Sequence, residues 1–248
     1  MNDYGPATYG DHIAEIYDRF HPGAGDAAAQ LRALAALAGR GGALELGIGT
    51  GRVALPLAEQ GVAVHGIDAS EAMIDKLRAK PGGDAIPVTI GDFAEVPVQG
   101  TFALIFAVFN TFFGLTTQED QVRCFQRVAG RLADGGVFLI EVFVPDPARF
   151  TRGQSVGVSN LDADGVTLDV ARHDPLHQQV HSQHLVLSES GTRIYPVQLR
   201  YAWPSELDLM ARLAGLRLRE RWTDWKGGPF TAASTSHISL YEREPAPR

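Results

Sequence analysis

Between residues 43 and 143 the chain alternates short, continuously apolar segments with segments of helical periodicity. Continuous apolar runs are typical of parallel strands covered on both faces, because neither face of such a sheet meets water. Strands that alternate with helices predict a doubly wound, Rossmann-like α/β fold, whose ligands bind at the carboxyl ends of the strands. The expected strands are 43–46, 62–67, 86–90, 102–108 and 137–143, and the expected helices between them are 52–60, 71–79 and 118–132.

The C-terminal part of the chain extends the same sheet. A helix at 205–214 is expected to end at Gly215, and strands at 216–222 and 237–243 complete a mostly parallel sheet of seven strands. The expected domain organisation is an N-terminal helical segment, a ligand-binding sheet domain in two pieces and an antiparallel insertion. Their bounds are 1–40, 41–148 with 204–248, and 149–203.

The N-terminal segment and the insertion have their own patterns. Residues 11–20 and 25–38 are predicted as helices. Between 154 and 203, short strand-like runs separated by turn signals predict antiparallel hairpins. The turn signals are Ala163-Asp164-Gly165, His173-Asp174-Pro175 and Ser190-Gly191.

The charge of the chain disfavours a nucleic acid as a partner. The 248 residues include 29 acidic and 22 basic side chains, for a net charge of -7 without any basic run. Such a surface repels phosphate backbones. Residues 1–12 lack the basic start and apolar block of a signal peptide, and the longest apolar stretch, 102–115, is too short to span a bilayer. We therefore expect a cytoplasmic protein that contacts neither nucleic acid nor membrane.

Neither the cysteine nor the histidines indicate a metal site. Cys124 is the single cysteine, so it forms no internal disulfide and no zinc-binding spacing. Four histidines occur in the insertion, at positions 173, 177, 181 and 184. In an extended strand the second and third of these share one face whereas the fourth points away, so three ligands do not converge. We expect no bound metal, and histidines that lie on the surface or line a pocket.

The segment from Glu45 to Arg52, ELGIGTGR, joins the first strand to the first helix. Glycines at 47, 49 and 51 permit positive φ angles and let the backbone approach a ligand closely. A nicotinamide fingerprint requires G-x-G-x-x-G, but its third glycine position is Arg52 in this chain. Glu45, two residues before the first glycine, could recognise an ammonium group of a ligand.

Two further strand ends carry carboxylates. Asp68 ends the second strand, about twenty residues after the glycines, where a carboxylate can accept hydrogen bonds from both hydroxyls of a ribose. The third strand ends in Gly91-Asp92-Phe93, which pairs an acceptor for an adenine amino group with a ring able to flank the base. Because these features fall at successive ends of one sheet, we expect them to bind one nucleoside-containing ligand.

These motifs make residues 11–143 similar to the class I S-adenosylmethionine-dependent methyltransferase superfamily. The resemblance implies that Glu45 and the glycines hold the methionine part of S-adenosylmethionine and that Asp68 holds the ribose. It also implies that the Asp92-Phe93 pair holds the adenine. The full set of cofactor-binding residues that the resemblance implies is Tyr9, Tyr17, Glu45, Gly47, Gly49, Gly51, Arg52, Asp68, Ala69, Met73, Gly91, Asp92, Phe93 and Ala107.

Residues 9–18, YGDHIAEIYD, are similar to a subgroup that methylates amino sugars and related bacterial metabolites. The subgroup includes N,N-dimethyltransferases of macrolide deoxysugars and N-methyltransferases of lincosamide antibiotics. The resemblance implies an N-terminal lid helix, with its Tyr-Asp pair near the cofactor, and an antiparallel insertion. The alternative is an amphipathic helix that buries Ile13, Ile16 and Tyr17.

Two positions after the fourth strand depart from related enzymes. The macrolide-sugar enzymes carry a histidine where this chain has Phe113-Gly114, so a base from that position is not expected. Amide- and adenine-directed enzymes carry an Asn/Asp-Pro-Pro-aromatic motif, whereas residues 110–113, NTFF, lack both prolines. These departures argue against nucleic-acid bases and large amides as acceptors.

Two residues are candidates for the catalytic step. Glu141 is the one charged side chain in the apolar run 137–144, and it is either a base or substrate anchor or a hydrogen-bonded structural carboxylate. Tyr17 could contact the cofactor or the transferred methyl group, because tyrosine lines apolar pockets with a polar tip. Three aromatic residues near the C-terminus form either core and turn structure or a wall of the substrate pocket. They are Trp222, Trp225 and Phe230.

The predicted function is methyl transfer from S-adenosylmethionine to a small-molecule acceptor, with an amine favoured over a hydroxyl. A free amine needs little beyond alignment with the methyl donor. The alternatives are an NAD-dependent oxidoreductase, which Arg52 disfavours, and a non-catalytic cofactor-binding protein. A monomer and a homodimer both remain open.

Overall fold

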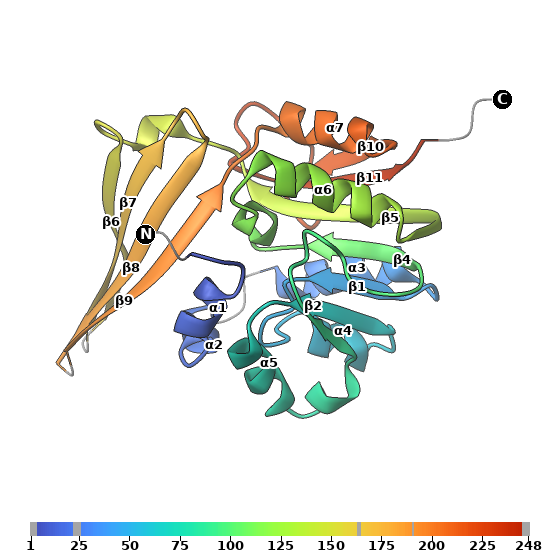
Figure 1. The fold of residues 1–248 in the computed structure, drawn as a ribbon, viewed down its shortest axis with the longest axis horizontal. Helices are drawn as coiled ribbons and strands as arrows, with labels where there is room; N and C mark the ends of the chain where they lie inside the picture. Colours follow the sequence, from blue (N-terminus) through green and yellow to red (C-terminus); the bar gives the residue numbers. More distant parts are fainter. Residues whose placement is uncertain (1–3, 22–25, 163–164, 190, 245–248) are drawn as a thin grey trace.

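Figure 1 shows a computed structural model of the chain, which describes residues 4–21, 26–162, 165–189 and 191–244. Its centre is a seven-stranded sheet with the order β10-β11-β5-β4-β1-β2-β3. The bounds are β1 (Ala43–Leu46), β2 (Val64–Asp68), β3 (Val88–Ile90), β4 (Phe102–Ala107), β5 (Leu132–Phe143), β10 (Leu216–Trp222) and β11 (Ser236–Arg243). The first five strands pair in parallel, and β11 is antiparallel to both β5 and β10. The expected doubly wound, mostly parallel fold is confirmed.

Helices cover both faces of this sheet. They are α3 (Ala27–Ala38), α4 (Ala54–Glu59), α5 (Glu71–Arg78), α6 (Gln118–Ala129) and α7 (Pro204–Leu213). On one face, the fully buried Leu44 and Ile105 pack in a core with α6 and α7. On the other, the fully buried Ala43 and Leu104 pack with α3, α4 and α5. This double coverage explains why the strands are apolar throughout.

The predicted hairpins form a separate antiparallel sheet, which stands to one side of the main sheet in Figure 1. Its strands are β6 (Gln154–Asp162), β7 (Gly165–Asp174), β8 (Gln179–Ser188) and β9 (Gly191–Arg200), paired in that order. The expected turn after His173 is confirmed, since Asp174 Oδ1 accepts a hydrogen bond from the N–H of Leu176 at 3.0 Å. His177 lies in this turn, so the expectation that it shares a strand face with His181 is wrong. The turn signals at 163–164 and 190 lie outside the described residues.

The N-terminal segment forms two short helices, α1 (Thr8–Ile13) and α2 (Tyr17–Phe20), in place of the single helix expected over 11–20. The chain leaves helical geometry between them. Asp11 accepts a hydrogen bond from Ser70 Oγ at 2.7 Å, at the start of α5. Docking against the loops of the main sheet therefore sets the shape of this segment. The second expected helix appears as α3, and its predicted start at residue 25 lies outside the described residues.

One boundary between elements also differs from expectation. The helix expected to reach residue 132 ends at Ala129, and β5 already begins at Leu132. Gly135, with a φ of +72°, lies inside this strand at an irregularity in the pairing of β4 with β5. Three 3₁₀ turns complete the fold, namely η1 (Gly83–Ala85), η2 (Thr111–Gly114) and η3 (Pro147–Arg149). Within the described ranges, every helix is too short or too polar to cross a membrane.

Candidate active site

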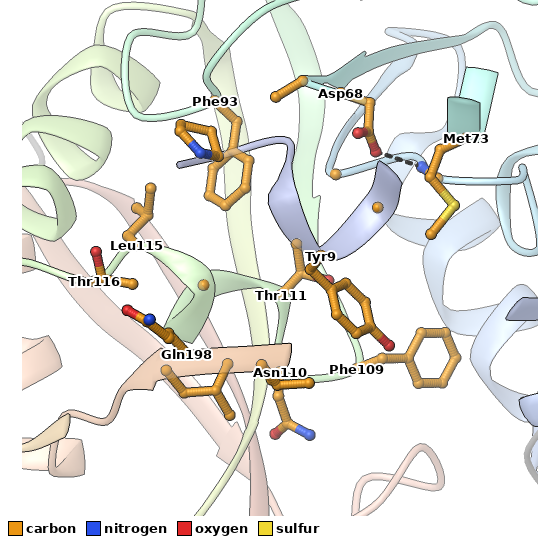
Figure 2. Close-up of a pocket in the computed structure, with 18 of the residues that line it drawn as sticks. Tyr9, Asp68, Met73, Phe93, Phe109, Asn110, Thr111, Leu115, Thr116 and Gln198 are labelled. Carbon is orange, nitrogen blue, oxygen red and sulfur yellow. Dashed lines mark hydrogen bonds between the residues drawn. The ribbon is translucent and has the colours of Figure 1, made fainter. Parts of the chain in front are cut away.

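A cavity of about 800 Å³ lies at the carboxyl ends of the first four strands of the main sheet, closed by α1, α2 and β9. Figure 2 shows Asp68 at the end of β2, and Phe93 and Thr111 after β3 and β4, around the same space as Tyr9 of α1. The predicted residues that line the cavity are Tyr9, Tyr17, Gly47, Gly49, Arg52, Asp68, Ala69, Met73, Asp92 and Phe93. Those that do not line it are Glu45, Gly51, Gly91, Ala107 and Glu141.

The glycine-rich loop after β1 forms one wall of the cavity. Gly47 and Gly49 have φ angles of +71° and +55°, which favour glycine. A Cβ on Gly47 would lie 2.5 Å from Thr111 Cγ2, whereas a Cβ on Gly49 would meet nothing within 4 Å. A Cβ on Gly51 would lie 2.3 Å from Leu77 Cδ1. The loop therefore has an open side at Gly49, while Gly51 makes room for packing behind the cavity.

Asp68 connects this loop to the start of α5. Its Oδ2 accepts a hydrogen bond from the N–H of Gly49 at 2.8 Å, and its Oδ1 accepts one from the N–H of Ser70 at 2.9 Å. Burial raises the pKa of this carboxyl, and the backbone N–H donors oppose the shift. Each carboxylate oxygen can accept more than one hydrogen bond, so Asp68 retains acceptor capacity toward the cavity.

The end of β3 supplies the Asp92-Phe93 pair. Asp92 Oδ1 accepts a hydrogen bond from the N–H of Ala94 at 2.8 Å, which fixes the turn after the strand. Figure 2 shows the Phe93 ring at the edge of the cavity, on the side of Leu115. Ala107, in contrast, is fully buried inside β4 and has no surface to offer a ligand.

Glu45 and Arg52 place an acidic and a basic side chain near the glycine loop. Glu45 is buried, and its Oε2 has no hydrogen-bond partner among the described residues. Burial raises the pKa of this carboxyl well above its usual value, while Arg52 opposes the shift. The Arg52 guanidinium lies 3.6 Å from the centroid of the Phe109 ring, and its buried Nε also lacks a partner in the described part of the chain. Because buried polar atoms are normally paired, these orphaned groups suit the ammonium and carboxylate of a bound amino acid, with Arg52 in the cavity wall and Glu45 directly behind it.

Tyr9, Tyr17 and His21 form an aromatic cluster on the side of the cavity that α1 and α2 cover. These two helices are called the lid below. The Tyr9 and Tyr17 ring centroids are 6.5 Å apart, those of Tyr17 and His21 are 4.8 Å apart, and the Tyr9 hydroxyl lies 3.3 Å from His21 Nε2. Burial raises the pKa of both tyrosines. Burial, together with Arg52 and His184, lowers the pKa of His21 to about 4. All three cluster residues are therefore uncharged at neutral pH.

Glu141 does not reach the cavity. Its Oε2 accepts a hydrogen bond from the N–H of Phe109 at 3.0 Å, and its Oε1 accepts one from Trp225 Nε1 at 2.8 Å. Burial raises the pKa of this carboxyl. Of the two interpretations of Glu141, the structure thus favours the hydrogen-bonded structural carboxylate. Trp222, Trp225 and Phe230 do not line the cavity either, so their loop belongs to core and turn structure.

Several cavity-lining residues were not predicted from the sequence. Val197, Gln198 and Leu199 of β9 line the cavity, as does the Phe109-Asn110 turn after β4. The apolar positions of β9 give no signal beyond that of an ordinary hairpin strand. His184 also lines the cavity, and it was foreseen only as one of four histidines on the surface or in a pocket.

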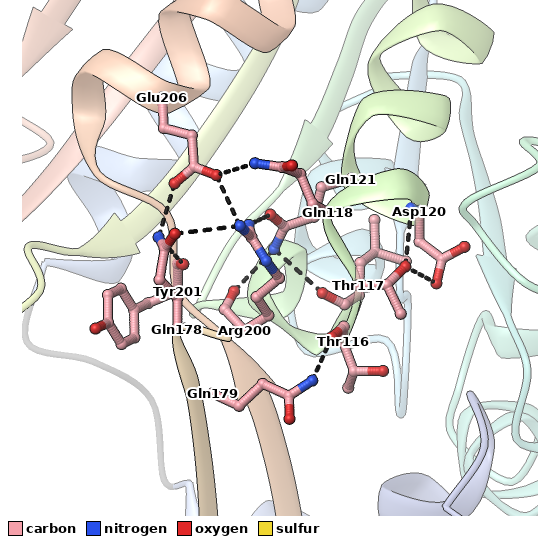
Figure 3. A network of polar contacts seen from close by, with 11 residues as sticks. Thr116, Thr117, Gln118, Asp120, Gln121, Gln178, Gln179, Arg200, Tyr201 and Glu206 are labelled. Carbon is pink, nitrogen blue, oxygen red and sulfur yellow. Dashed lines mark hydrogen bonds and ion pairs between the residues drawn. The ribbon is translucent and has the colours of Figure 1, made fainter. Parts of the chain in front are cut away.

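A buried ion pair holds β9 in place, as Figure 3 shows. Arg200, at the end of β9, is 5% exposed and donates through Nη2 to Glu206 Oε1 at 2.7 Å. Its Nη1 donates to Gln121 Oε1 at 2.6 Å, and Gln178 Nε2 donates to Glu206 Oε2 at 2.7 Å. Because Gln121 belongs to α6 and Glu206 to α7, this network joins the antiparallel sheet to the main domain beside the cavity.

Comparisons with known proteins identify the family. Residues 43–136 match a family model described as a methyltransferase domain. Over 246 residues the chain is 31% identical to the cypemycin N-terminal methyltransferase of Streptomyces sp, an alignment that covers 96% of this chain and 99% of that protein. The chain belongs to the S-adenosylmethionine-dependent methyltransferase family. The methyl donor of this methyltransferase is therefore S-adenosylmethionine, as its strand-end motifs predicted.

Two further relatives are also methyltransferases of Streptomyces. The solved structure of the CcbJ methyltransferase from Streptomyces caelestis has a TM-score of 0.92 and 41% identity, covering 98% of this chain and 100% of that one. A dTDP-3-amino-3,6-dideoxy-alpha-D-glucopyranose N,N-dimethyltransferase of Streptomyces fradiae is 29% identical over 173 residues, 67% of this chain and 66% of that protein. The expected resemblance is confirmed, and the oxidoreductase and non-catalytic alternatives are set aside.

Proposed function

We propose that this methyltransferase transfers a methyl group to an amine nitrogen of a small metabolite, with a hydroxyl acceptor as the alternative. The observation that carries the proposal is the chemistry of the cavity lining. It includes imidazoles, which are mild bases, whereas the carboxylate predicted as a base, Glu141, lies outside it. An ammonium loses its proton to a mild base, but a hydroxyl needs stronger activation. One relative above is an N,N-dimethyltransferase of an amino sugar by name, and another is an N-terminal methyltransferase, which supports an amine.

The size of the cavity favours a compact acceptor. About 800 Å³, bounded by the lid helices and β9, must accommodate both the methyl donor and the acceptor. Concave sites of this size suit small molecules better than the surface of a folded protein. By their names, one relative acts on the N-terminus of cypemycin and another on a dTDP-linked amino sugar. We take an amino sugar or an amino-acid-derived precursor of a secondary metabolite as the acceptor class.

We assign the methionine part of the donor to Glu45 and Arg52, the ribose to Asp68, and the adenine to the Asp92-Phe93 pair. When bound, S-adenosylmethionine supplies a methyl group on a positively charged sulfur. The orphaned oxygen of Glu45 and the orphaned nitrogen of Arg52 support the first assignment. Tyr17 lines the same cavity, and we propose that it helps to align the acceptor with the methyl group, which is where most of the rate of such a displacement can originate.

A paired-acceptor assay tests the proposal. S-adenosylmethionine with a radiolabelled methyl group is incubated with 3-amino-3-deoxyglucose and with trialanine amide, each beside its N-acetylated form. We expect label in the free amines and none in the N-acetylated partners, because acetylation removes the nucleophilic lone pair. Label in the N-acetylated sugar, which keeps its hydroxyls, would favour a hydroxyl acceptor. Absence of label from every amine would contradict the proposal.

We also propose that the methyltransferase is a homodimer formed through the outward face of the antiparallel sheet. The register places Val158, Leu168, Leu185 and Ile194 in one row across β6 to β9. Val158 is 63% exposed and Ile194 is 50% exposed, and apolar patches of this kind are typical of interfaces. Two copies of a chain with net charge -7 repel each other wherever their acidic side chains meet. This row has no charged side chain, so a second copy can pack against it in a symmetric contact.

A further inference from the structure

His184 of β8 belongs to the cavity wall. In the register of the antiparallel sheet, His184 lies between Asp169 of β7 and Tyr195 of β9, so the three side chains share one face. Phe20 of α2 packs against the His184 ring with a centroid distance of 5.8 Å, which places this face against the lid. His181, three residues earlier, lies on the opposite face of the same strand and does not line the cavity.

Asp169 determines which nitrogen of the His184 ring is protonated. His184 Nδ1 forms a hydrogen bond with Asp169 Oδ1. Because an ionised carboxylate only accepts hydrogen bonds, Nδ1 carries the ring proton and Nε2 keeps its lone pair. The same carboxylate stabilises the imidazolium that forms when Nε2 takes a proton. The His184 side chain is 22% exposed and that of Asp169 is 43% exposed, so the proton can pass on to water.

The titratable groups that face His184 are Asp169 of β7, Tyr195 of β9 and His21 after α2. Burial, together with the charge of Arg52, lowers the pKa of His21 to about 4, which makes it a poor proton acceptor at neutral pH. Tyr195 is buried among the apolar side chains of the lid. Among His184, Asp169, Tyr195 and His21, only His184 has both a basic ring nitrogen and a carboxylate that hydrogen-bonds to the ring.

We propose that His184, held by Asp169, is the general base that takes the proton of the acceptor ammonium. This inference rests on the proposed amine acceptor. The ammonium nitrogen gives its proton to Nε2 of His184, and its freed lone pair forms the N–CH₃ bond while the S–CH₃ bond breaks toward sulfur. An ammonium R–NH₃⁺ and a methyl sulfonium thus yield R–NH₂CH₃⁺, a neutral thioether and one proton, which leaves through the imidazole to water.

Three variants test the inference over a range from about pH 6 to about pH 10, with whichever amine of the paired assay is the better acceptor. His184→Gln removes the base, and Asp169→Asn removes the charge that orients it. His181→Gln is the matched control on the opposite face of the same strand. Calorimetric binding of S-adenosylhomocysteine reports whether each variant keeps its fold and donor site, and we expect unchanged affinity for all three.

For His184→Gln we expect kcat/KM about 100-fold below that of the wild type near neutral pH, and within about fivefold once the pH exceeds the pKa of the acceptor, because solution then supplies free amine. Asp169→Asn should lose about tenfold near neutral pH, since the imidazole remains but its orientation and counter-charge are lost. His181→Gln should match the wild type at every pH.

A loss by the same factor at every pH would mark a merely structural role and overturn the inference. Wild-type activity of His184→Gln near neutral pH would overturn it as well, and both results leave the amine acceptor intact. If His184→Gln fails to bind S-adenosylhomocysteine, Asp169→Asn decides by the same pH criterion. If the wild type methylates no amine, the proposed function and this inference fail together.

Discussion

Phe109 and Asn110 are successive non-glycine residues with positive φ angles of +56° and +65°. Such left-handed conformations cost about 1 kcal/mol each or more, so the surrounding structure must hold them. The N–H of Phe109 and the N–H of Asn110 donate to the side chain and the backbone oxygen of Glu141 at 3.0 and 3.1 Å. Asn110 Oδ1 in turn accepts from the N–H of Phe143 at 2.8 Å. Through these hydrogen bonds, β5 holds the Phe109 ring against Arg52. Glu141 thus shapes the cavity wall although it lies outside the cavity.

Glu141→Gln tests this positioning role. The amide has one oxygen for two donors, the N–H of Phe109 and the indole of Trp225, so one donor loses its acceptor. We expect the free energy of unfolding in urea to fall by about 1–3 kcal/mol, and turnover to stay within about tenfold of the wild type. Glu220→Gln is the control, because Glu220 accepts from Trp222 Nε1 at 2.8 Å in an exposed position. A loss of several thousandfold with the donor still bound would instead make Glu141 a catalytic residue.

Glu45 gives stability a pH dependence whose sign follows from its burial. Its folded-state pKa lies well above the ordinary value, so the folded protein keeps a proton that the unfolded chain releases. The associated stability is present below the ordinary carboxyl pKa and is lost as the pH rises toward the folded-state pKa. Glu45→Gln should therefore show a smaller fall in the free energy of unfolding between about pH 5 and pH 8. Equal slopes in urea titrations would contradict this, and the exposed Glu71→Gln is the control.

At the scale of elements, the lid docks through a steric fit at one end and charge at the other. Gly10 of α1 lies so close to α5 that a Cβ would be 2.5 Å from Ser70 Cβ. Asp18 of α2 accepts a hydrogen bond from Thr50 Oγ1 at 2.6 Å and pairs with Lys80 Nζ at 2.6 Å. Helices as short as α1 and α2 are not stable alone, so these contacts determine their position.

Gly10→Ala should displace the lid without unfolding the sheet domain. The added methyl group forces α1 away from Ser70 and moves Tyr9 and Tyr17 relative to the cavity. We expect turnover to fall about 10- to 100-fold and the thermal midpoint to change by less than about 4 °C. Gly157→Ala in β6 is the control, because its Cβ would meet nothing within 4 Å. Normal turnover of Gly10→Ala, or of a protein lacking residues 1–20, would show that the lid does not order the site.

The elements also show which features could be predicted from the sequence. The strand expected at 216–222 has those bounds in the structure, because local apolar patterning is sufficient to define a strand of this kind. The position of Asp68 and Asp92 beside one cavity could be predicted, because parallel strand ends converge at one edge of a sheet. The break between α1 and α2 could not, since it depends on docking against residues far along the chain.

The hydrogen-bond partners of Glu141 and the cavity-facing side of β9 could not be predicted. The indole that binds Glu141 belongs to Trp225, 84 residues away in the sequence, and no local pattern connects the two. The face that β9 turns toward the cavity depends on how the antiparallel sheet sits on the main domain. That placement rests on the contacts of Arg200 with Glu206 of α7 and Gln121 of α6. The sequence of the hairpins does not reveal these two partners.

At the scale of the whole molecule, Figure 1 shows two sheets of different construction side by side. Residues from both line the cavity. The main sheet supplies the loops proposed to hold the methyl donor, and the antiparallel sheet supplies a wall and an outward apolar face. The lid packs against both sheets, because Ile13 and Tyr195 share one apolar cluster with Met73. We propose the division of the chain into segments 1–40, 41–148 with 204–248, and 149–203, which pack together around this cluster.

The proposed homodimer predicts a specific response to charge on the outward face. Val158→Glu places a carboxylate in the apolar row, where burial against a second copy is costly, and should yield a monomer in sedimentation velocity. Leu176→Glu is the control, because Leu176 is 82% exposed in the turn between β7 and β8, outside the row. We expect the wild type and the control to sediment as dimers at about 10 µM, and a monomeric wild type would contradict the interface.

The central claim is that this cavity directs a methyl group from S-adenosylmethionine to an amine nitrogen. The most direct measurement is the NMR spectrum of the product formed with S-adenosylmethionine whose methyl carbon is isotopically labelled. We predict a labelled carbon with the chemical shift of an N-methyl group, and loss of that signal when the acceptor amine is acetylated. A labelled O-methyl signal, or transfer that persists on the acetylated acceptor, would contradict the claim.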